Sequence, residues 1–195
     1  WAASPADILT SGEATARYLQ RLKPQARIYL LGTADLIREF EINGFVLTAD
    51  NPDFVVLGFD MTLTYEKLVV ACNLIRRGVP FVATHPDFNC PTEDGYIPDC
   101  GSIIELIHAS TGTRPYIVGK PNPEIVAVAL SKKTYLPQQV AIVGDRLYTD
   151  IATGKNSGIK SILVLTGEAT VDDLKQSTIK PDYVFHNLGA IGKFL

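Results

Sequence analysis

Short apolar runs alternate with helical segments in the first half of the chain, and this alternation limits the possible folds more than any other feature. The apolar runs have the length and composition of buried strands, and the segments between them space their apolar residues along one face of a helix. The strands are expected at 27–32, 53–60 and 80–84, and the helices at 34–42 and 65–77. This order predicts an α/β fold with a parallel sheet and covering helices.

The second half of the chain repeats the pattern with apolar runs at 140–145, 161–165 and 183–185. A change in composition near Arg114 separates the two halves. We therefore predict two lobes. They cover residues 13–114 and 115–195, after a short segment, 1–12, that ends in a hinge at Thr10-Ser11-Gly12.

Composition excludes several classes of function. The 195 residues are 46% hydrophobic and 20% charged, as in an ordinary globular protein, and the net charge of −3 argues against a nucleic-acid partner. No apolar run approaches the roughly 18 residues of a membrane helix. The three cysteines form no CxxC pair, which favours reduced thiols and a cytoplasmic location.

The chain begins at Trp1, and its single methionine is Met61. A translated protein starts with methionine, so we expect this chain to be processed or to be a piece of a longer protein.

Two carboxylates follow the apolar run at 140–145. Asp145 ends the run directly after Gly144, and Asp150 stands at the expected start of a helix. The ordinary interpretation is a loop residue and a helix N-terminal acid favoured by the helix dipole. The alternative is a Mg²⁺ site, because Mg²⁺ prefers one or two carboxylates with water and phosphate oxygens. Asp145 would be the ligand, and Asp150 would orient a metal-bound water or Lys120.

Lys120 lies in the turn Gly119-Lys120-Pro121-Asn122-Pro123, which precedes a helix expected to be capped by Asn122 with Pro123 at its first position. A lysine held in such a turn can present a compact positive charge to a phosphoryl group. The alternative is a solvated surface lysine, which is the common case.

Together these residues resemble a known family. The segments GKPNPEIV and IVGDRLYTDI resemble the haloacid dehalogenase (HAD) superfamily of aspartate-nucleophile phosphatases. In its order of motifs, Lys120 matches the lysine of motif III, and Asp145 and Asp150 match the GDxxxxD form of motif IV. The earlier segments PDFVVLGFD, TYEKL and ATHPD resemble the NagD-like, 4-nitrophenylphosphatase-type branch. The resemblance implies a partial Rossmann-like HAD core (three-layer α/β/α) with an inserted C2-type α/β cap domain.

The same resemblance defines what the sequence lacks. Motif I of the superfamily, DxDGxx, carries the nucleophilic aspartate and the general acid, and no DxDG occurs in the 195 residues. A strand ending in the Thr or Ser of motif II is also missing. Without the missing segment, we expect the sheet formed by the strands at 140–145 and 161–165 to have an unpaired edge. We therefore expect the natural protein to contain that segment. We also expect this chain alone to be inactive.

Three further residues are candidates for substrate binding. The resemblance implies that the long loop His85–Cys100 faces the active site, where His85 and Asp87 would contact the leaving group. Asn122, beside Lys120, is the third candidate. The alternative for His85 is an ordinary loop histidine.

These observations predict a Mg²⁺-dependent phosphomonoester hydrolase that acts on a small phosphorylated metabolite through an aspartyl-phosphate. A second hypothesis is a non-catalytic, degenerate HAD-like protein that binds a phosphorylated metabolite or a protein partner. A third is a receiver-like α/β domain, against which the GKPNP turn and the long cap insertion argue. Caps in this branch often form dimer contacts, so the resemblance also allows a homodimer through the cap.

Overall fold

The computed structural model describes residues 4–131 and 133–192, and it divides into two compact units, Trp1–Gly119 and Lys120–Leu195. Sequence analysis placed the division at 114/115, whereas the structure places it at 119/120. The reason is that Tyr116–Ile117 forms a strand, β7, which pairs with β4 (Phe81–Ala83) of the first unit. At the expected hinge, residues 10–12, the structure has the start of α1, where Thr10 accepts a hydrogen bond from the backbone N–H of Glu13 as an N-cap.

The first unit contains the alternating strands and helices that the apolar pattern predicts. In order they are η1 (Pro5–Asp7), α1 (Ser11–Leu22), β1 (Arg27–Leu31), α2 (Ala34–Ile42), β2 (Val46–Leu47), β3 (Phe54–Leu57), α3 (Tyr65–Arg76), β4, β5 (Asn89–Thr92), β6 (Gly95–Pro98), α4 (Cys100–Thr111) and β7.

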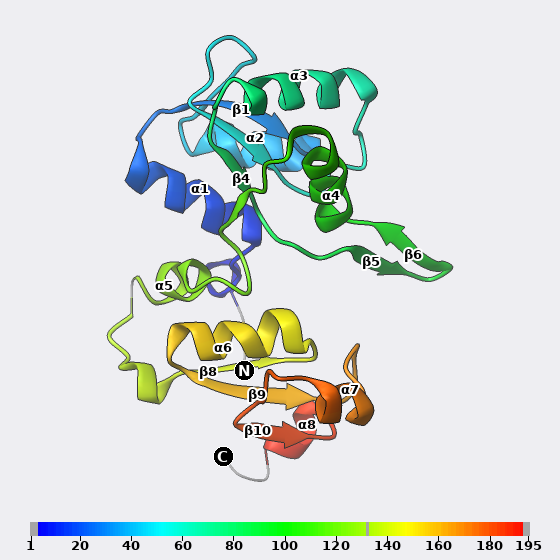
Figure 1. The fold of residues 1–195 in the computed structure, drawn as a ribbon. Coiled ribbons are helices and arrows are strands. Elements are labelled where there is room, and N and C mark those ends of the chain that lie inside the picture. Colours follow the sequence, from blue (N-terminus) through cyan, green and yellow to red (C-terminus); the bar gives the residue numbers. More distant parts are fainter. Residues whose placement is uncertain (1–3, 132, 193–195) are drawn as a thin grey trace. The chain divides into compact units, whose positions relative to one another are not determined.

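Five of these strands form a parallel sheet in the order β2-β1-β3-β4-β7 (Figure 1). The chain leaves β1 toward one edge to form β2 and then crosses to the other side for β3 and β4. Because parallel crossovers are right-handed, α2 covers one face of the sheet, and α3 and α4 cover the other. The buried residues Leu57, Ala83 and Ile107 belong to the core between that second helix pair and the sheet.

The segment between β4 and α4 is not the irregular loop that its prolines suggest. Residues 89–98 form an antiparallel hairpin, β5–β6, with Asn89 opposite Pro98 and Thr92 opposite Gly95. The hairpin projects from the sheet in Figure 1. Proline weakens a strand pattern in sequence, but an isolated hairpin tolerates it at positions where no ladder bond is donated. The expectation of a structureless loop is therefore wrong for these residues.

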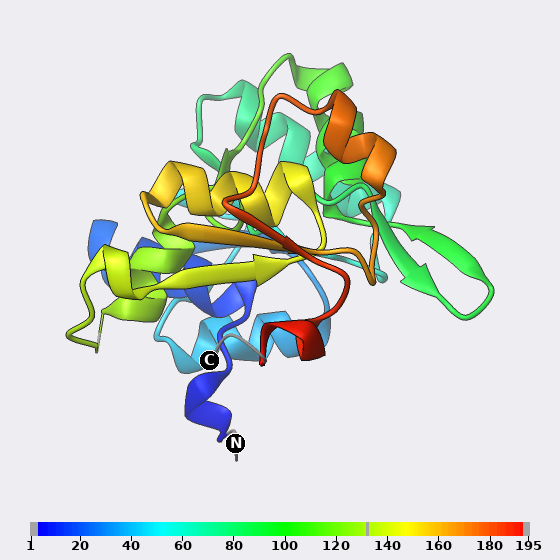
Figure 2. The ribbon, with the colours of Figure 1, turned by 90° about the horizontal axis from the view of Figure 1, so that it is seen from below.

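The second unit contains a parallel sheet of three strands in the order β10-β9-β8, with β8 at its edge in the described part of the chain. Figures 1 and 2 show α6 along β8 and β9. The elements are α5 (Glu124–Leu130), η2 (Pro137–Gln139), β8 (Ala141–Gly144), η3 (Leu147–Ile151), α6 (Ala152–Ser157), β9 (Lys160–Val164), α7 (Val171–Gln176), β10 (Tyr183–Phe185) and α8 (Leu188–Ile191).

Two helix starts in this unit differ from expectation. The structure begins α5 at Glu124 and gives Pro123, not Asn122, as its N-cap, with no hydrogen bond from a capping side chain. The helix expected from Thr149 is preceded by a π-helical turn, η3, and turns of this kind are frequent at functional sites.

None of the helices in the described part of the chain combines the length and the apolar character that a membrane span requires.

Candidate functional site

Asp145 occupies the turn directly after β8, at the carboxyl end of the sheet in the second unit. Its Oδ2 accepts the backbone N–H of Glu168 at 2.8 Å, and its own carbonyl accepts the N–H of Ala169 at 3.0 Å. Both donors lie in the loop after β9, the neighbouring strand. The carboxylate is therefore held by backbone groups of a second strand end, where open α/β sheets place their ligand sites.

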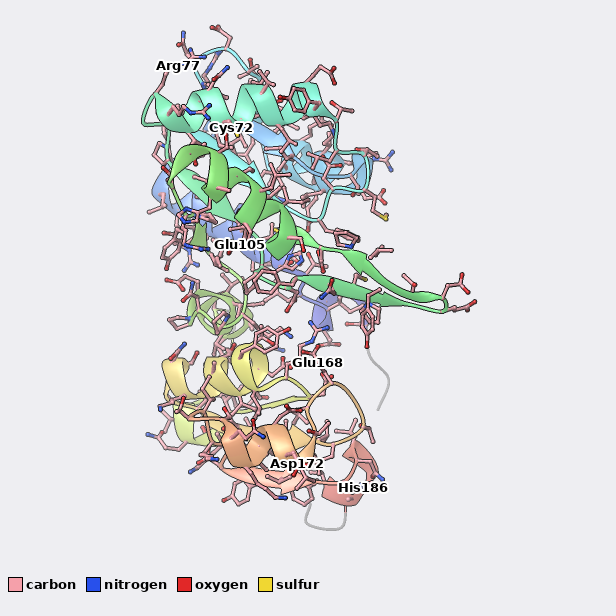
Figure 3. The ribbon with its side chains drawn as sticks, turned by 45° about the vertical axis from the view of Figure 1, so that its right-hand side comes forward. Cys72, Arg77, Glu105, Glu168, Asp172 and His186 are labelled. Atoms are coloured by element: carbon pink, nitrogen blue, oxygen red, sulfur yellow. The ribbon has the colours of Figure 1, made fainter. Side chains whose placement is uncertain are left out.

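Gly167 and Glu168 complete this arrangement, and sequence analysis did not identify them. A side chain at Gly167 would overlap the Asp145 carboxylate, so only glycine permits this approach. Glu168, labelled in Figure 3, accepts a 2.6 Å hydrogen bond from Nε of Arg146. That ion pair joins the two loops on either side of Asp145. Their position in the sequence could have identified them, because Gly167 and Glu168 follow β9, the strand that pairs with β8.

Lys120 and Asp150 form an ion pair. Nζ of Lys120 lies 2.7 Å from Oδ1 of Asp150, and Oδ2 of Asp150 accepts the backbone N–H of Arg146 at 3.1 Å. Asp150 is only 4% exposed, whereas the Lys120 side chain is 42% exposed. A side chain at Gly144 would overlap the Asp150 carboxyl group. Asp150 is thus fixed on both oxygens, and it holds a lysine whose charge remains accessible.

The turn that carries Lys120 is fastened to α6. The Lys120–Pro121 peptide bond is cis, and the carbonyl of Pro121 accepts a 2.9 Å hydrogen bond from Nδ2 of Asn156. Asn122 is half-buried in the same turn. The second unit therefore contains four of the six residues that sequence analysis selected, and it pairs two of them directly.

The residues around Asp145 fit a magnesium ion. Among the described residues, Oδ1 of Asp145 accepts no hydrogen bond, while Oδ2 is fixed by Glu168. Mg²⁺ binds hard oxygen ligands, often one or two carboxylates together with water and substrate phosphate. Asp145 offers such an oxygen, whereas both oxygens of Asp150 are engaged by N–H donors.

The first unit places His85 between two strand ends and a helix start. Its Nε2 lies 2.9 Å from Oδ1 of Asp99, and its Nδ1 lies 2.8 Å from Oγ1 of Thr84 and 3.5 Å from Oγ of Ser11. Ligand atoms of His85, Asp87 and Asp99 all lie within 4.8 Å of one another. Sequence analysis missed Asp99 and Thr84, because the first reads as a helix cap and the second as the end of a strand.

A cavity of about 1010 Å³ lies at the carboxyl end of the first unit's sheet, and its wall includes Ser11, Thr84 and His85. Cys100 is buried nearby. Burial raises the pKa of its thiol to about 12, so Cys100 is not a nucleophile. Cys72, Cys90 and Cys100 form no disulfide in the structure.

The family profile of HAD-hydrolase-like proteins matches residues 117–191. An acid sugar phosphatase of Staphylococcus aureus is 38% identical over 187 residues, which are 95% of this chain and 72% of the relative.

Solved structures show the same relationship. The 4-nitrophenylphosphatase of Thermotoga maritima is 54% identical, with a TM-score of 0.91 over 95% of this chain and 72% of that protein. A glycerol phosphate phosphatase of Mycobacterium tuberculosis, in complex with magnesium, is 33% identical, with a TM-score of 0.90 over 97% of this chain and 60% of that protein.

The fold and these relatives agree with the motif order of the sequence. Because this fold class combines an α/β core with an inserted α/β cap, the first unit is called the cap and the second the core. The chain belongs to the haloacid dehalogenase superfamily of phosphatases, in its NagD-like, 4-nitrophenylphosphatase branch.

Proposed function

We propose that this chain provides the metal-binding and phosphate-binding part of a Mg²⁺-dependent phosphomonoesterase. The observation that carries the proposal is the arrangement at the end of β8. There the backbone of Glu168 fixes Asp145, and a buried Asp150 holds the accessible Lys120. An acidic strand end beside a held lysine suits a ligand that combines a metal ion with a phosphoryl group.

Each residue has a distinct proposed role. Asp145 binds the metal ion through Oδ1. Lys120 stabilises the negative charge that develops on the phosphoryl oxygens, because a fixed cation costs no reorganisation during the reaction. Asp150 positions Lys120 through the 2.7 Å ion pair. When bound, Mg²⁺ would neutralise phosphate charge and orient the phosphoryl group.

Substrate choice is assigned to the cap loop and to the lysine turn. His85 and Asp87 begin the segment that carries the β5–β6 hairpin, and Asn122 stands beside Lys120. The substrate proposed is a small phosphorylated metabolite. The names of the relatives make sugar phosphates and glycerol phosphate the first compounds to test.

The nucleophile and the general acid are proposed to lie outside these 195 residues, since no DxDG occurs among them. With a nucleophilic aspartate supplied, the reaction would proceed through an aspartyl-phosphate that water then hydrolyses. The genomic sequence ahead of the Trp1 codon tests this point. A DxDG and a Thr-ended strand within roughly 70 residues, about the length of two strand–helix units, would support it.

Calorimetry with Mg²⁺ on the 195-residue chain tests the metal site directly. Asp145→Asn should weaken Mg²⁺ binding at least about tenfold, because a neutral amide replaces a charged ligand. The matched control is Asp172→Asn, which removes an exposed carboxylate of the same unit (Figure 3). Equal Mg²⁺ affinity in the wild type and Asp145→Asn would contradict the proposal.

Activity of the same chain tests the origin of the nucleophile. With Mg²⁺ and 4-nitrophenyl phosphate, the 195 residues should show no turnover above background. Robust turnover would show that the nucleophile is among them and would overturn that part of the proposal.

The absence of DxDG also supports a second candidate, a non-catalytic protein that binds a phosphorylated metabolite or a protein partner. Its metal and phosphate binding would be the same as in the phosphatase. It would be distinguished by a complete natural sequence that has no DxDG.

A further inference from the structure

Three side chains of types that bind metal ions meet in the first unit, whereas the residues proposed to bind Mg²⁺ belong to the second unit. His85 follows β4, Asp87 lies two residues later, and Asp99 is the N-cap of α4. One ligand atom from each lies within 4.8 Å of the others. The three come from both ends of the segment that carries the β5–β6 hairpin.

Backbone contacts hold these two chain ends together without a metal ion. The carbonyl of Asp87 accepts the N–H of Gly101 at 2.7 Å, and the carbonyl of Phe88 accepts the N–H of Asp99 at 2.9 Å. A side chain at Gly101 would overlap the carbonyl of Pro86. The ligands are thus set in place by the fold, which lowers the entropic cost of binding an ion.

The contact of His85 Nδ1 with Thr84 has the form found in a metal-bound histidine. Such a histidine binds the ion through one ring nitrogen and donates the other N–H to an oxygen, which fixes the ring. Nε2 of His85 faces Oδ1 of Asp99 at 2.9 Å, and Nδ1 lies 2.8 Å from Oγ1 of Thr84. An ion at Nε2 would replace its proton, and Nδ1–H would then donate to Thr84.

The spacing of the ligand atoms fits a coordination sphere. Two ligands about 2.1 Å from one ion are separated by about 3.0 Å when adjacent in an octahedron and by about 4.2 Å when opposite. The 2.9 Å between Nε2 of His85 and Oδ1 of Asp99 is a hydrogen-bond distance that adjacent ligands of one ion also have, and the 4.8 Å limit brings the third ligand atom to within a small adjustment of the same ion.

Burial and charge also favour a cation. The side chains of His85 and Asp99 are only 17% and 10% exposed, and Oδ1 of Asp87 is buried. Two carboxylates this close repel each other where water is largely excluded. His85 also lines the cavity of about 1010 Å³, which gives an ion a path to the site.

We propose that His85, Asp87 and Asp99 form a second metal site, which binds a divalent transition metal ion such as Zn²⁺ in the cap. One imidazole and two carboxylates suit ions of this class, whereas Mg²⁺ prefers oxygen ligands alone. His85 and Asp87 are also the residues assigned above to substrate choice, but metal binding to this site is measured without the phosphatase reaction.

Zinc calorimetry on the 195-residue chain tests the site after chelator treatment, with excess Mg²⁺ present to occupy the site at Asp145. His85→Gln, Asp87→Asn and Asp99→Asn should each weaken Zn²⁺ binding at least about tenfold. Asn is a good N-cap, so Asp99→Asn keeps the start of α4. Circular dichroism without metal would show whether each variant remains folded.

The controls are His186→Gln, which removes an exposed histidine of the second unit (Figure 3), and Asp145→Asn. Both should leave this Zn²⁺ affinity unchanged. The chain has three histidines, so ring-nitrogen NMR during the titration provides an independent measurement, in which Zn²⁺ should shift the His85 signals alone. Unshifted His85 signals, or equal losses in His85→Gln and His186→Gln, would overturn the proposal.

Discussion

The two parallel sheets of this protein have similar contacts at the amino ends of their strands and different residues at the carboxyl ends. In the cap, Asp53 precedes β3, binds the N–H of Arg27 on β1 at 2.9 Å and pairs with Lys23 at 2.7 Å. In the core, Asp182 precedes β10, binds the N–H of Ser161 on β9 at 2.9 Å and pairs with Lys160 at 2.7 Å. Each aspartate follows a proline, so the sequences PDFVV and PDYVF contain the same Pro-Asp motif, whose aspartate binds the neighbouring strand.

The carboxyl ends of the strands have no such motif in common. In the core, β8 and β9 end in Asp145 and in the Gly167-Glu168 loop, which suit a metal ion and phosphate. In the cap, β4 ends in Thr84 and His85, beside a cavity. The amino ends of these parallel strands thus carry bonds between neighbouring strands, and the residues proposed for metal and phosphate binding lie at the carboxyl ends, where other open α/β sheets place their ligands.

The largest expected effect concerns the sizes of the two cores. Leu163 is fully buried in the small core cluster of the second unit, and Leu57 is fully buried in the larger cluster of the cap. Leu163→Ala and Leu57→Ala should each lower the free energy of unfolding by about 2–5 kcal/mol. Because the described cluster that contains Leu163 is smaller than the one that contains Leu57, Leu163→Ala should unfold the second unit at a lower denaturant concentration than Leu57→Ala unfolds the cap. Hydrogen exchange of the β9 and β3 amides would measure each unit separately.

In that experiment, Leu163→Ala should reduce protection in β9 and leave β3 protected. Equal losses of protection in β9 and β3 would mean that the units unfold together, which would contradict the division drawn here.

A second comparison concerns the glycines at the carboxyl ends. Gly144→Ala would force the new methyl group into the Asp150 carboxyl group, which is fixed on both oxygens. Gly58→Ala in the cap would meet only the end of the Leu36 side chain, which can rotate. We expect Gly144→Ala to cost about 1–3 kcal/mol and Gly58→Ala less. Urea denaturation would measure both, and a larger loss for Gly58→Ala would contradict the assignment.

Sequence reasoning predicted the features that depend on local pattern. Alternating apolar runs gave the strand and helix order, and motif spacing selected Lys120, Asp145 and Asp150. It missed contacts between residues far apart in sequence. Asp99 meets His85 across fourteen residues, and the backbone of Glu168 meets Asp145 across twenty-three. Such contacts are decided by tertiary packing, which periodicity does not encode. The β5–β6 hairpin was missed because its prolines mask the strand pattern.

The N-caps of α3 and α7 allow a third comparison, in which we expect a smaller effect of about equal size in the two units. Thr64 caps α3 in the cap by accepting the N–H of Lys67, and Thr170 caps α7 in the core by accepting the N–H of Asp173. Asp173 also accepts the N–H of Thr170, which completes a capping box. Each Thr→Ala change should cost about 1 kcal/mol in urea denaturation, and Thr→Ser should restore most of it. A Thr→Ser variant no better than Thr→Ala would mean that the methyl group, not the cap, stabilises the helix.

The smallest expected effect is the pH dependence of the two Pro-Asp motifs at the amino ends of β3 and β10. The Lys160 hydrogen bond, followed by the Ser161 N–H, lowers the pKa of Asp182 from 3.8 to about 2. The Lys23 hydrogen bond, followed by the Arg27 N–H, lowers the pKa of Asp53. A carboxylate whose pKa is lower in the folded state stabilises the fold above its unfolded pKa, and this contribution is lost as pH falls through the folded pKa.

The stability difference between the wild type and Asp182→Asn should therefore be constant from neutral pH to about 4 and should disappear between about 4 and 2. The stability difference between the wild type and Asp53→Asn should likewise decrease as pH falls. Urea denaturation across this pH range would measure both, with Asp172→Asn as the control, because Asp172 is exposed and pairs with the exposed Lys175. If Asp182→Asn behaved like Asp172→Asn at neutral pH, the backbone contact would contribute nothing. The repeated Pro-Asp sequence would then mark a turn and not a stabilising bond between neighbouring strands.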